Sequence, residues 1–476
     1  MEPEVAQTDV AASNPSSSAP VAAPSIEPSL DHDASRLPGW LARGRDRLTS
    51  WLRYGTGPYK LLQGLSRVRD TRRRPRIPTE DVLRSLLFAA TLRIPSLNAL
   101  EGALKTSGFQ RLLGRTAIEG KKTFSADTIS RVLDGAYLDD IRRLLPELLE
   151  QAERKKLFRE GESDCRRVVA IDGWEQHKSY DRHCADCLTR EVPVGDHKTR
   201  TQYYHRWAVA LLLGQQADVV LDAEPLLTAD KRDPNDKAGD AHEGESTAAL
   251  RLLDRLHGTF ADWLDLFVVD ALYASGPWMT RIVEHGYGSI ITVKKETDEP
   301  FKDFLVLTRD KPPSNTWQDE KRGERYRAWD VDDIETLDTF KGKIRVLRVE
   351  VRTTASDVPH NWCAAVVGEA ARRLPARTIH RLHRSRWHIE NTLFNQITQY
   401  WNLEHVYRHT PNAIQAVTLI WILVFNLLNL FVYCRLRRPR VPRDPSDTIR
   451  DIVGQIAAAV ASLRRRVPWA LLLDTS

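Results

Sequence analysis

The chain has 476 residues, enough for two to four domains of ordinary size. It holds 70 Lys and Arg against 64 Asp and Glu, and this net charge of +6 favours a polyanionic partner. Five scattered cysteines argue against a disulfide framework, and the acidic residues 1–4 argue against a signal peptide, so we expect a reducing, cytoplasmic setting.

The N-terminal third predicts a tail followed by helices. Residues 1–36 are rich in Ser, Pro and Ala, and they predict a disordered tail because they hold too little apolar surface to offset chain entropy. Residues 37–160 carry a helical period of apolar residues, with Thr79 and Ser125 placed to cap two helices. We therefore expect a helical domain here.

An arginine cluster at residues 67–76 lies within this helical region and includes Arg72, Arg73 and Arg74. Short capped helices beside clustered arginines favour a DNA-binding domain. A helical domain with a solvated basic linker has the same pattern, so the sequence leaves both open.

Residues 161–297 predict an α/β fold built on two short apolar runs. The runs end at Asp172 and Asp270, and runs of this kind are typical of strands buried on both faces. Three consecutive strands, then strands alternating with helices, predict a mixed sheet flanked by helices. A right-handed crossover would place the two aspartates on adjacent parallel strands. This arrangement is ribonuclease-H-like.

The elements of this core follow from local patterns. The first strand is expected to end at Asp172. Apolar runs and helical periods predict the other strands and helices, which are strands at 206–213, 219–224, 264–270 and 289–293 and helices at 245–257 and 278–285.

Residues 298–372 change character and predict a β-rich insertion, with strands at 326–331, 343–352 and 362–367. Helical periodicity returns over residues 373–434, which we assign to the same core as 161–297. Glu390 lies beside its apolar stripe, and Arg386 is one turn earlier on the same face.

Residues 413–434 are long and apolar enough to cross a bilayer. However, polar residues interrupt the stretch at Gln415, Asn426 and Asn429, and a helix that is apolar all round is also typical of a large core. We expect a core helix and no membrane partner. Residues 435–476 predict a basic C-terminal helical segment whose arginines contact phosphates.

Asp172, Asp270 and Glu390 are hard oxygen ligands that one α/β core would bring together, and such clusters suit Mg²⁺ or Mn²⁺. Two such ions can activate an attacking oxygen and stabilise the leaving oxygen of a phosphodiester. The alternative for each aspartate is a strand-end residue that caps a turn.

These residues resemble the DDE transposases of bacterial insertion sequences over about residues 75–435. The resemblance rests on residues 266–274 (LFVVDALYA), which look like the second-aspartate motif, and residues 386–390, which look like the third-acid helix. Residues 203–207, Glu224-Pro225 and Glu245-Ser246 also look like family landmarks. The resemblance implies that Asp172, Asp270 and Glu390 are the metal-binding triad.

The third-acid motif of the related cut-and-paste branch reads Tyr-x2-Arg-x3-Glu-x6-Lys, and this chain departs from it twice. His383 stands in place of the Tyr and Ile397 in place of the Lys. The resemblance implies that Arg386 contacts the phosphate of the transposon end. It also places His383 among the DNA-contacting residues, and Arg384 is a substitute for the missing Lys.

A second constellation is the pair Cys184 and Cys187, a Cys-x2-Cys spacing that supplies half of a zinc site. His177, His183 or His197 would complete it. The alternative is a metal-free turn with two thiols.

The leading hypothesis is a transposase that cuts at insertion-sequence ends and joins the 3′-OH to target DNA. The alternatives are a nuclease or resolvase on the same fold without strand transfer, or a catalytically inert DNA-binding protein descended from a transposase. The expected partners are the terminal repeats and the target DNA. The resemblance also implies a homodimer on paired ends and a place at the nucleoid of a bacterium.

Overall fold

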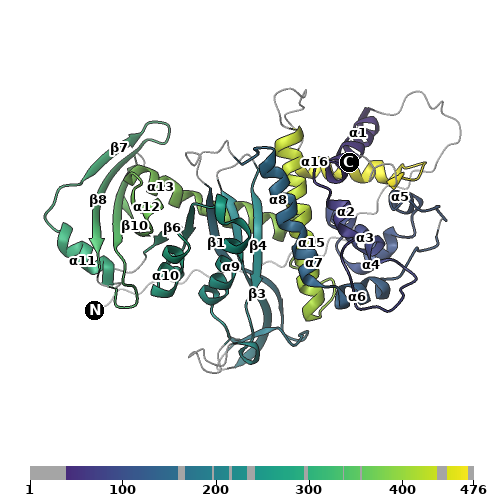
Figure 1. The fold of residues 1–476 in the computed structure, drawn as a ribbon, viewed down its shortest axis with the longest axis horizontal. Helices are drawn as coiled ribbons and strands as arrows, with labels where there is room; N and C mark the ends of the chain where they lie inside the picture. Colours follow the sequence, from purple (N-terminus) through teal and green to yellow (C-terminus); the bar gives the residue numbers. More distant parts are fainter. Residues whose placement is uncertain are drawn as a thin grey trace, which may run out of the picture. The chain divides into compact units, whose positions relative to one another are not determined.

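The fold described below, taken from a computed structural model, is that of the unit Trp40–Ser476 (Figure 1). The predicted tail at residues 1–36 lies outside the described residues. The structure describes residues 39–118, 120–158, 167–195, 198–213, 217–232, 242–293, 299–335, 337–353, 356–436 and 448–469.

A ten-stranded sheet runs through the described part of this unit, in the order β2-β3-β1-β5-β6-β10-β9-β8-β7, with β4 also paired to β3. Its strands are β1 (Val168–Ser179), β2 (Leu188–Pro193), β3 (Thr199–Leu213), β4 (Val219–Pro225), β5 (Leu266–Val269), β6 (Gly288–Thr292), β7 (Asn315–Asp319), β8 (Glu324–Ile334), β9 (Ile344–Thr353) and β10 (Ser356–Val367).

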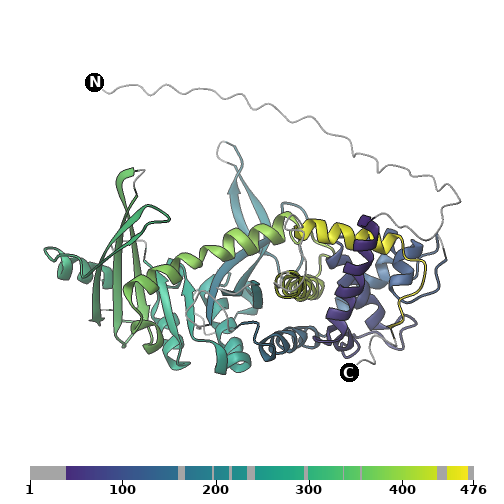
Figure 2. The ribbon, with the colours of Figure 1, turned by 90° about the horizontal axis from the view of Figure 1, so that it is seen from above.

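The part of the sheet from β4 to β6 is mixed. β3 runs antiparallel to β1 and to β4, whereas β5 runs parallel to both β1 and β6. Helices α9 (Glu245–Phe260) and α10 (Gly276–Glu284) cover one face (Figure 1), and the helix that contains α13 (Ala376–Ser385) crosses the other (Figure 2). This confirms the predicted ribonuclease-H-like α/β fold.

Strand β1 is longer than the sequence predicted. It does not end at Asp172 but continues to Ser179 and pairs with the first half of β3, which begins at Thr199. The extension was missed because the apolar run stops at Ile171. Beyond it buried and more exposed residues alternate, as they do in a strand with one covered face.

The predicted insertion does not form a separate sheet. β10 pairs antiparallel with β6, so β7 to β10 extend the core sheet at that edge. A helix that the sequence reading missed, α11 (Glu299–Thr308), precedes these strands.

Helices of the N-terminal region precede the sheet. They are α1 (Gly39–Thr56), α2 (Leu61–Leu65), α3 (Thr79–Thr91), α4 (Leu97–Ala103), α5 (Ser107–Leu112), α6 (Ala126–Gly135), α7 (Leu138–Arg142) and α8 (Leu144–Arg154). Ser125 caps α6 as predicted, by accepting from the backbone N–H of Thr128. Thr79 is not a cap. It is the first residue of α3, and its hydroxyl donates to Asp70 instead.

The apolar stretch forms α15 (Pro411–Asn429), which continues as the π-helix η5 (Leu430–Leu436). In its most apolar 18 residues, 94% of the stretch is buried inside the protein, so it is a core helix, as predicted. It packs between β4 on one side and the N-terminal helices α3 and α6 on the other (Figure 1). The predicted C-terminal helix is α16 (Ile449–Ala461), which packs against α5.

The polar residue Asn426 is accommodated in the buried helix α15 because its side-chain amide is hydrogen-bonded. Its side chain is fully buried, donates to the carbonyl of Val220 at 2.7 Å and accepts from the N–H of Val220 at 2.8 Å. Val220 lies on β4, which pairs with β3 on one side and, among the described residues, with no strand on the other. The amide therefore takes the place of a neighbouring strand.

We expect Asn426→Ala to reduce the free energy of unfolding by about 1–3 kcal/mol, because both backbone groups of Val220 would lose their partner in a buried place. Urea unfolding followed by circular dichroism measures this loss. Gln415→Ala is the matched control, since Gln415 is a half-buried amide on the same helix. Equal losses in the two variants would contradict the role given to Asn426.

Candidate active site

Asp172 and Asp270 lie on neighbouring parallel strands. β1 and β5 pair in the register Val168 with Leu266 through Ala170 with Val268. Continued two residues beyond the last pair, this register would bring Asp172 opposite Asp270. Asp270 follows the last residue of β5, and its Oδ1 accepts from the N–H of Leu272 at 2.7 Å. The parallel pairing that the sequence predicted for these two strands is thus present, and a shared site for the two acids stays a prediction.

Glu390 reaches the same place from the helical segment after the insertion. It lies in a π-helical turn, η4 (Ile389–Phe394), between α13 and α14 (Asn395–Gln399). Ile389 and Leu393 are buried on the core side, while the Glu390 side chain is 42% exposed. The wider turn sits where a carboxylate is directed towards the sheet, and π-turns are frequent at functional sites.

Arg386 links two of the acids directly. Its Nη1 donates to Asp172 Oδ2 and to Glu390 Oε1, each at 2.8 Å. The guanidinium is only 7% exposed, so both interactions are made largely away from water. Arg386 therefore connects β1 to the Glu390 turn across more than two hundred residues of sequence.

Asp172 lies where the ionised form of a carboxyl group is unfavourable. Burial raises the pKa of Asp172 above its ordinary range, and repulsion from Glu245 and Glu390 adds to the rise. The backbone N–H of Gly173 and the charge of Arg386 oppose it. A carboxylate in this position requires a nearby cation in order to remain ionised.

Glu245 is a further acid beside Asp172, and it is buried. Its carboxylate accepts from the Tyr273 hydroxyl at 2.9 Å and from Arg206 Nη2 at 2.6 Å. A Cβ on Gly173 would lie 1.8 Å from Glu245 Oε2, so glycine is required for this close approach. The sequence marked Glu245 only as a family landmark, and nothing local indicated that it supports Asp172.

The three predicted ligands fit a hard divalent ion. They offer carboxylate oxygens, which Mg²⁺ and Mn²⁺ prefer. The guanidinium of Arg386 binds both Asp172 and Glu390, so the surroundings of these two acids stabilise a positive charge. Asp172, Asp270 and Glu390 are thus the residues that would hold such ions.

His383, one of the predicted DNA-contacting residues, is buried in the core. It is 4% exposed, and its Nε2 accepts from the indole N–H of Trp362 at 3.1 Å. A contact between His383 and DNA would require this packing to open. The side chain instead fixes α13 against β10.

Arg384, the proposed substitute for the missing lysine, is 41% exposed on its side chain. It donates to Glu324 at 3.0 Å and to the Tyr326 hydroxyl at 3.2 Å, both on β8. Its predicted DNA contact competes with this ion pair.

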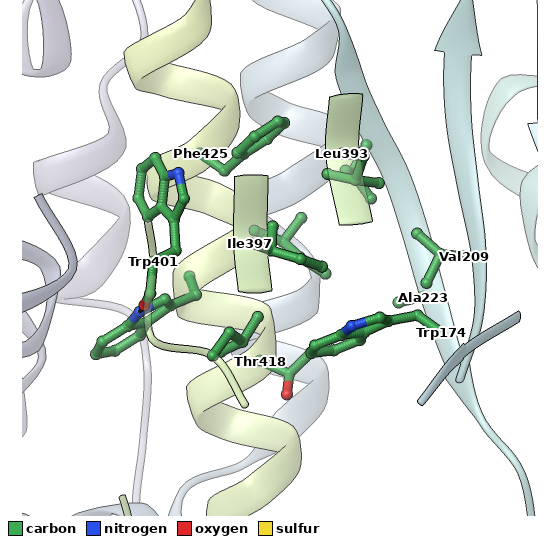
Figure 3. A pocket seen from close by; sticks show the side chains of 12 residues that line it. Trp174, Val209, Ala223, Leu393, Ile397, Trp401, Thr418 and Phe425 are labelled. Carbon is green, nitrogen blue, oxygen red and sulfur yellow. Dashed lines mark hydrogen bonds between the residues drawn. The ribbon is translucent and has the colours of Figure 1, made fainter. Parts of the chain in front are cut away.

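Ile397, which stands where the related motif has lysine, packs in the core. It lines an apolar pocket with Leu393, Trp174 and Trp401, between the sheet and α15 (Figure 3). A lysine here would bury its charge among these side chains, which is costly without a partner. The departure from the motif therefore matches the surroundings of this position.

The arginines near α3 differ in their surroundings. Arg72 donates to both oxygens of Asp70 and is only 17% exposed on its side chain, so it holds a turn. Arg73 and Arg74 are exposed. A DNA contact by any of the three stays a prediction.

The Cys-x2-Cys pair is completed by histidines that the sequence did not single out. Cys184 and Cys187 lie next to His205 and His409, and the four ligand atoms are within 4.8 Å of one another. His183 stacks on Tyr203 instead, and His197 lies outside the described residues.

Comparisons with known proteins add one finding. Residues 230–427 match the family model of the transposase DDE domain. The matched segment includes Asp270 and Glu390 but begins after Asp172, which is joined to it through β1 and Arg386. A search of curated proteins gave no match.

The buried His383 predicts a pH effect on stability. Burial, with the charge of Arg386, lowers the pKa of His383 to about 3, whereas the unfolded chain has an ordinary value near 6.5. Between these values the unfolded chain binds the extra proton, so the free energy of unfolding falls as the pH falls. His383→Gln keeps a hydrogen-bond acceptor but does not titrate.

We therefore expect His383→Gln to lose about 2 kcal/mol less stability than the parent protein when the pH is lowered from about 7 to about 5. Urea unfolding at the two pH values measures the difference. His360→Gln is the control, because His360 is an exposed histidine on β10. An unchanged pH dependence in His383→Gln would show that the histidine is not kept neutral by burial.

Proposed function

We propose that the chain is a DDE transposase that cleaves the ends of an insertion sequence and transfers the 3′-OH into target DNA, because residues 230–427 match the model of the transposase DDE domain. The observation that supports the proposal is that Arg386 binds both Asp172 and Glu390, while Asp270 directly follows β5, the parallel neighbour of the strand that carries Asp172.

The proposed chemistry uses these acids as ligands of Mg²⁺ or Mn²⁺. Such ions, when bound, activate the attacking oxygen and stabilise the leaving oxygen of the phosphodiester. The chain fixes Asp172 and Asp270 on paired strands, so their separation is set by the sheet. Glu390 is more exposed and reaches the site from a helix, so DNA and ions would approach the site from the side of Glu390.

Arg386 has a proposed part in both states of the enzyme. Without DNA it neutralises Asp172 and Glu390. With a transposon end bound, we propose that its guanidinium contacts a phosphate, because guanidinium groups bind phosphate oxygens as well as carboxylates. The same positive charge would then serve two negatively charged partners in turn.

Further partners follow from the proposed reaction. Two ends must be joined together, which favours a homodimer on paired ends. The exposed Arg73 and Arg74 near α3 would contact DNA outside the acid centre. A DNA-acting enzyme of this kind would work at the nucleoid of a bacterial cytoplasm.

The decisive test is a strand-transfer assay with Mg²⁺ on DNA that carries the terminal repeats of the element. We expect Asp172→Asn, Asp270→Asn and Glu390→Gln each to lower joining roughly 100-fold or more, which is about 3 kcal/mol of transition-state stabilisation. The controls are Asp310→Asn and Glu335→Gln, which change exposed acids outside the site.

Each outcome has a distinct meaning. Normal joining by all three site variants would exclude the proposed mechanism. Cleavage without joining by the parent protein would indicate a nuclease or resolvase. Binding of the ends with neither cleavage nor joining would indicate an inert DNA-binding protein.

The proposed phosphate contact predicts a change in salt dependence. Arg386→Gln should weaken end binding and lower the slope of log K against log salt by about one, because one phosphate contact is lost. Fluorescence anisotropy over a range of salt concentrations measures this slope. Arg377→Gln is the control, since Arg377 is exposed on α13 and lies nine residues earlier, on the opposite side of the helix. An equal slope for Arg386→Gln and the parent protein would exclude the contact.

A further inference from the structure

Two cysteines and two histidines converge at a place outside the acid centre. Cys184 and Cys187 lie in the connection between β1 and β2, His205 lies on β3, and His409 lies in the segment between α14 and α15. Cys187 and His205 are buried, and Cys184 and His409 are half-buried. The cluster is therefore assembled from three separate parts of the chain and is largely shielded from water.

Four of the six distances between the ligand atoms are close to those of a tetrahedral zinc centre. Zn–S bonds of about 2.3 Å and Zn–N bonds of about 2.0 Å give edges of roughly 3.8 Å between two sulfurs and roughly 3.5 Å between sulfur and nitrogen. The two sulfurs are 3.8 Å apart. His205 Nε2 is 3.5 Å from Cys184 Sγ and 3.3 Å from Cys187 Sγ, and His409 Nε2 is 3.3 Å from Cys187 Sγ.

We propose that Cys184, Cys187, His205 and His409 bind one structural Zn²⁺. Two thiolates and two imidazoles form a common closed zinc set, with no position left open for a substrate. Sulfur ligands also select against Mg²⁺ and Mn²⁺, which prefer oxygen. The zinc site does not depend on the proposed function, because it is separate from the acids in both position and chemistry.

Neighbouring groups support this set of ligands. The backbone N–H of Cys184 donates to Cys187 Sγ at 3.3 Å, an interaction that stabilises a thiolate. The ring of His177 lies edge-on against that of His409, with 4.6 Å between the ring centres. These contacts hold one cysteine and one histidine in place, as outer-shell partners of metal ligands do.

The zinc would join the paired strands β1 and β3 to the segment that follows the Glu390 helix. Near His409, Gln176 on β1 donates to the carbonyl of Leu403 at 2.9 Å. On either side of His409, Arg408 and Thr410 bind Asp134 at the end of α6. A metal at this junction would therefore tie the catalytic sheet, the Glu390 segment and the N-terminal helices together.

The test is elemental analysis of the full chain purified without chelator. We expect about one equivalent of zinc in the parent protein, and less than about a fifth of an equivalent in Cys184→Ser and in His409→Gln. Cys363→Ser and His183→Gln are matched controls and should keep their zinc, since Cys363 lies on β10 and His183 stacks on Tyr203. Asp172→Asn should also keep it, which separates this site from the acid centre.

A second measurement covers variants that fail to fold. Thiol modification of the folded parent protein should leave Cys184 and Cys187 protected until a chelator is added, while Cys363 should react equally with and without it. Cobalt replacement should give the intense visible bands of tetrahedral Co²⁺ bound to thiolate. Less than about a tenth of an equivalent of zinc in the parent protein, or chelator-independent reaction of both thiols, would overturn the proposal.

Discussion

The bridge from Arg386 to Asp172 and Glu390 is the interaction on which the site depends. A buried carboxylate such as Asp172 is stable as an anion only with a compensating charge, and Arg386 supplies it at 2.8 Å. The same guanidinium holds Glu390, so the helical segment after the insertion is fixed to β1 by electrostatics as well as by packing. Removing the arginine would leave two acids close together with no cation between them, and this requirement for positive charge is what makes the place suitable for divalent ions.

The sheet gives this bridge its rigidity. Asp172 lies within β1, where it pairs with Val209 of β3, and the three residues Val168 to Ala170 just before it pair with β5 on the other side. Behind it, Gly173 leaves room for Glu245, which is held in turn by Tyr273 and Arg206. Glu245 therefore pairs with Arg206 and Tyr273 and not with Arg386. Its negative charge nevertheless raises the pKa of Asp172.

Apolar runs predicted the centre of the fold because they report burial on both faces. They identified the strands before Asp172 and Asp270, and the crossover rule then placed these strands together. The extension of β1 beyond Asp172 was missed because its side chains alternate between the buried and the more exposed face of the sheet. No continuous run of apolar residues therefore marks it. The third-acid helix was recognised from its resemblance to the family motif, but the motif does not show what packs against His383 and Ile397. The burial of each depends on side chains brought from other strands and helices.

The cysteine pair shows the same limit more sharply. Its spacing predicted half of a metal site, because both cysteines lie in one turn. The two histidines come from a strand and from a segment more than two hundred residues further on, so only the fold could identify them.

Strand β1 connects the two sites that the chain assembles. Asp172 lies within it, and the turn that holds Cys184 and Cys187 follows its far end. The donors at one site are oxygens and at the other sulfur and nitrogen, so a hard and a soft cation would not compete for them. Glu390 and His409 come from one continuous segment after the insertion, which therefore meets β1 at both sites. A metal at the cysteines would fix the far end of that segment, and Arg386 fixes the near end, so the orientation of Glu390 would be set from two sides.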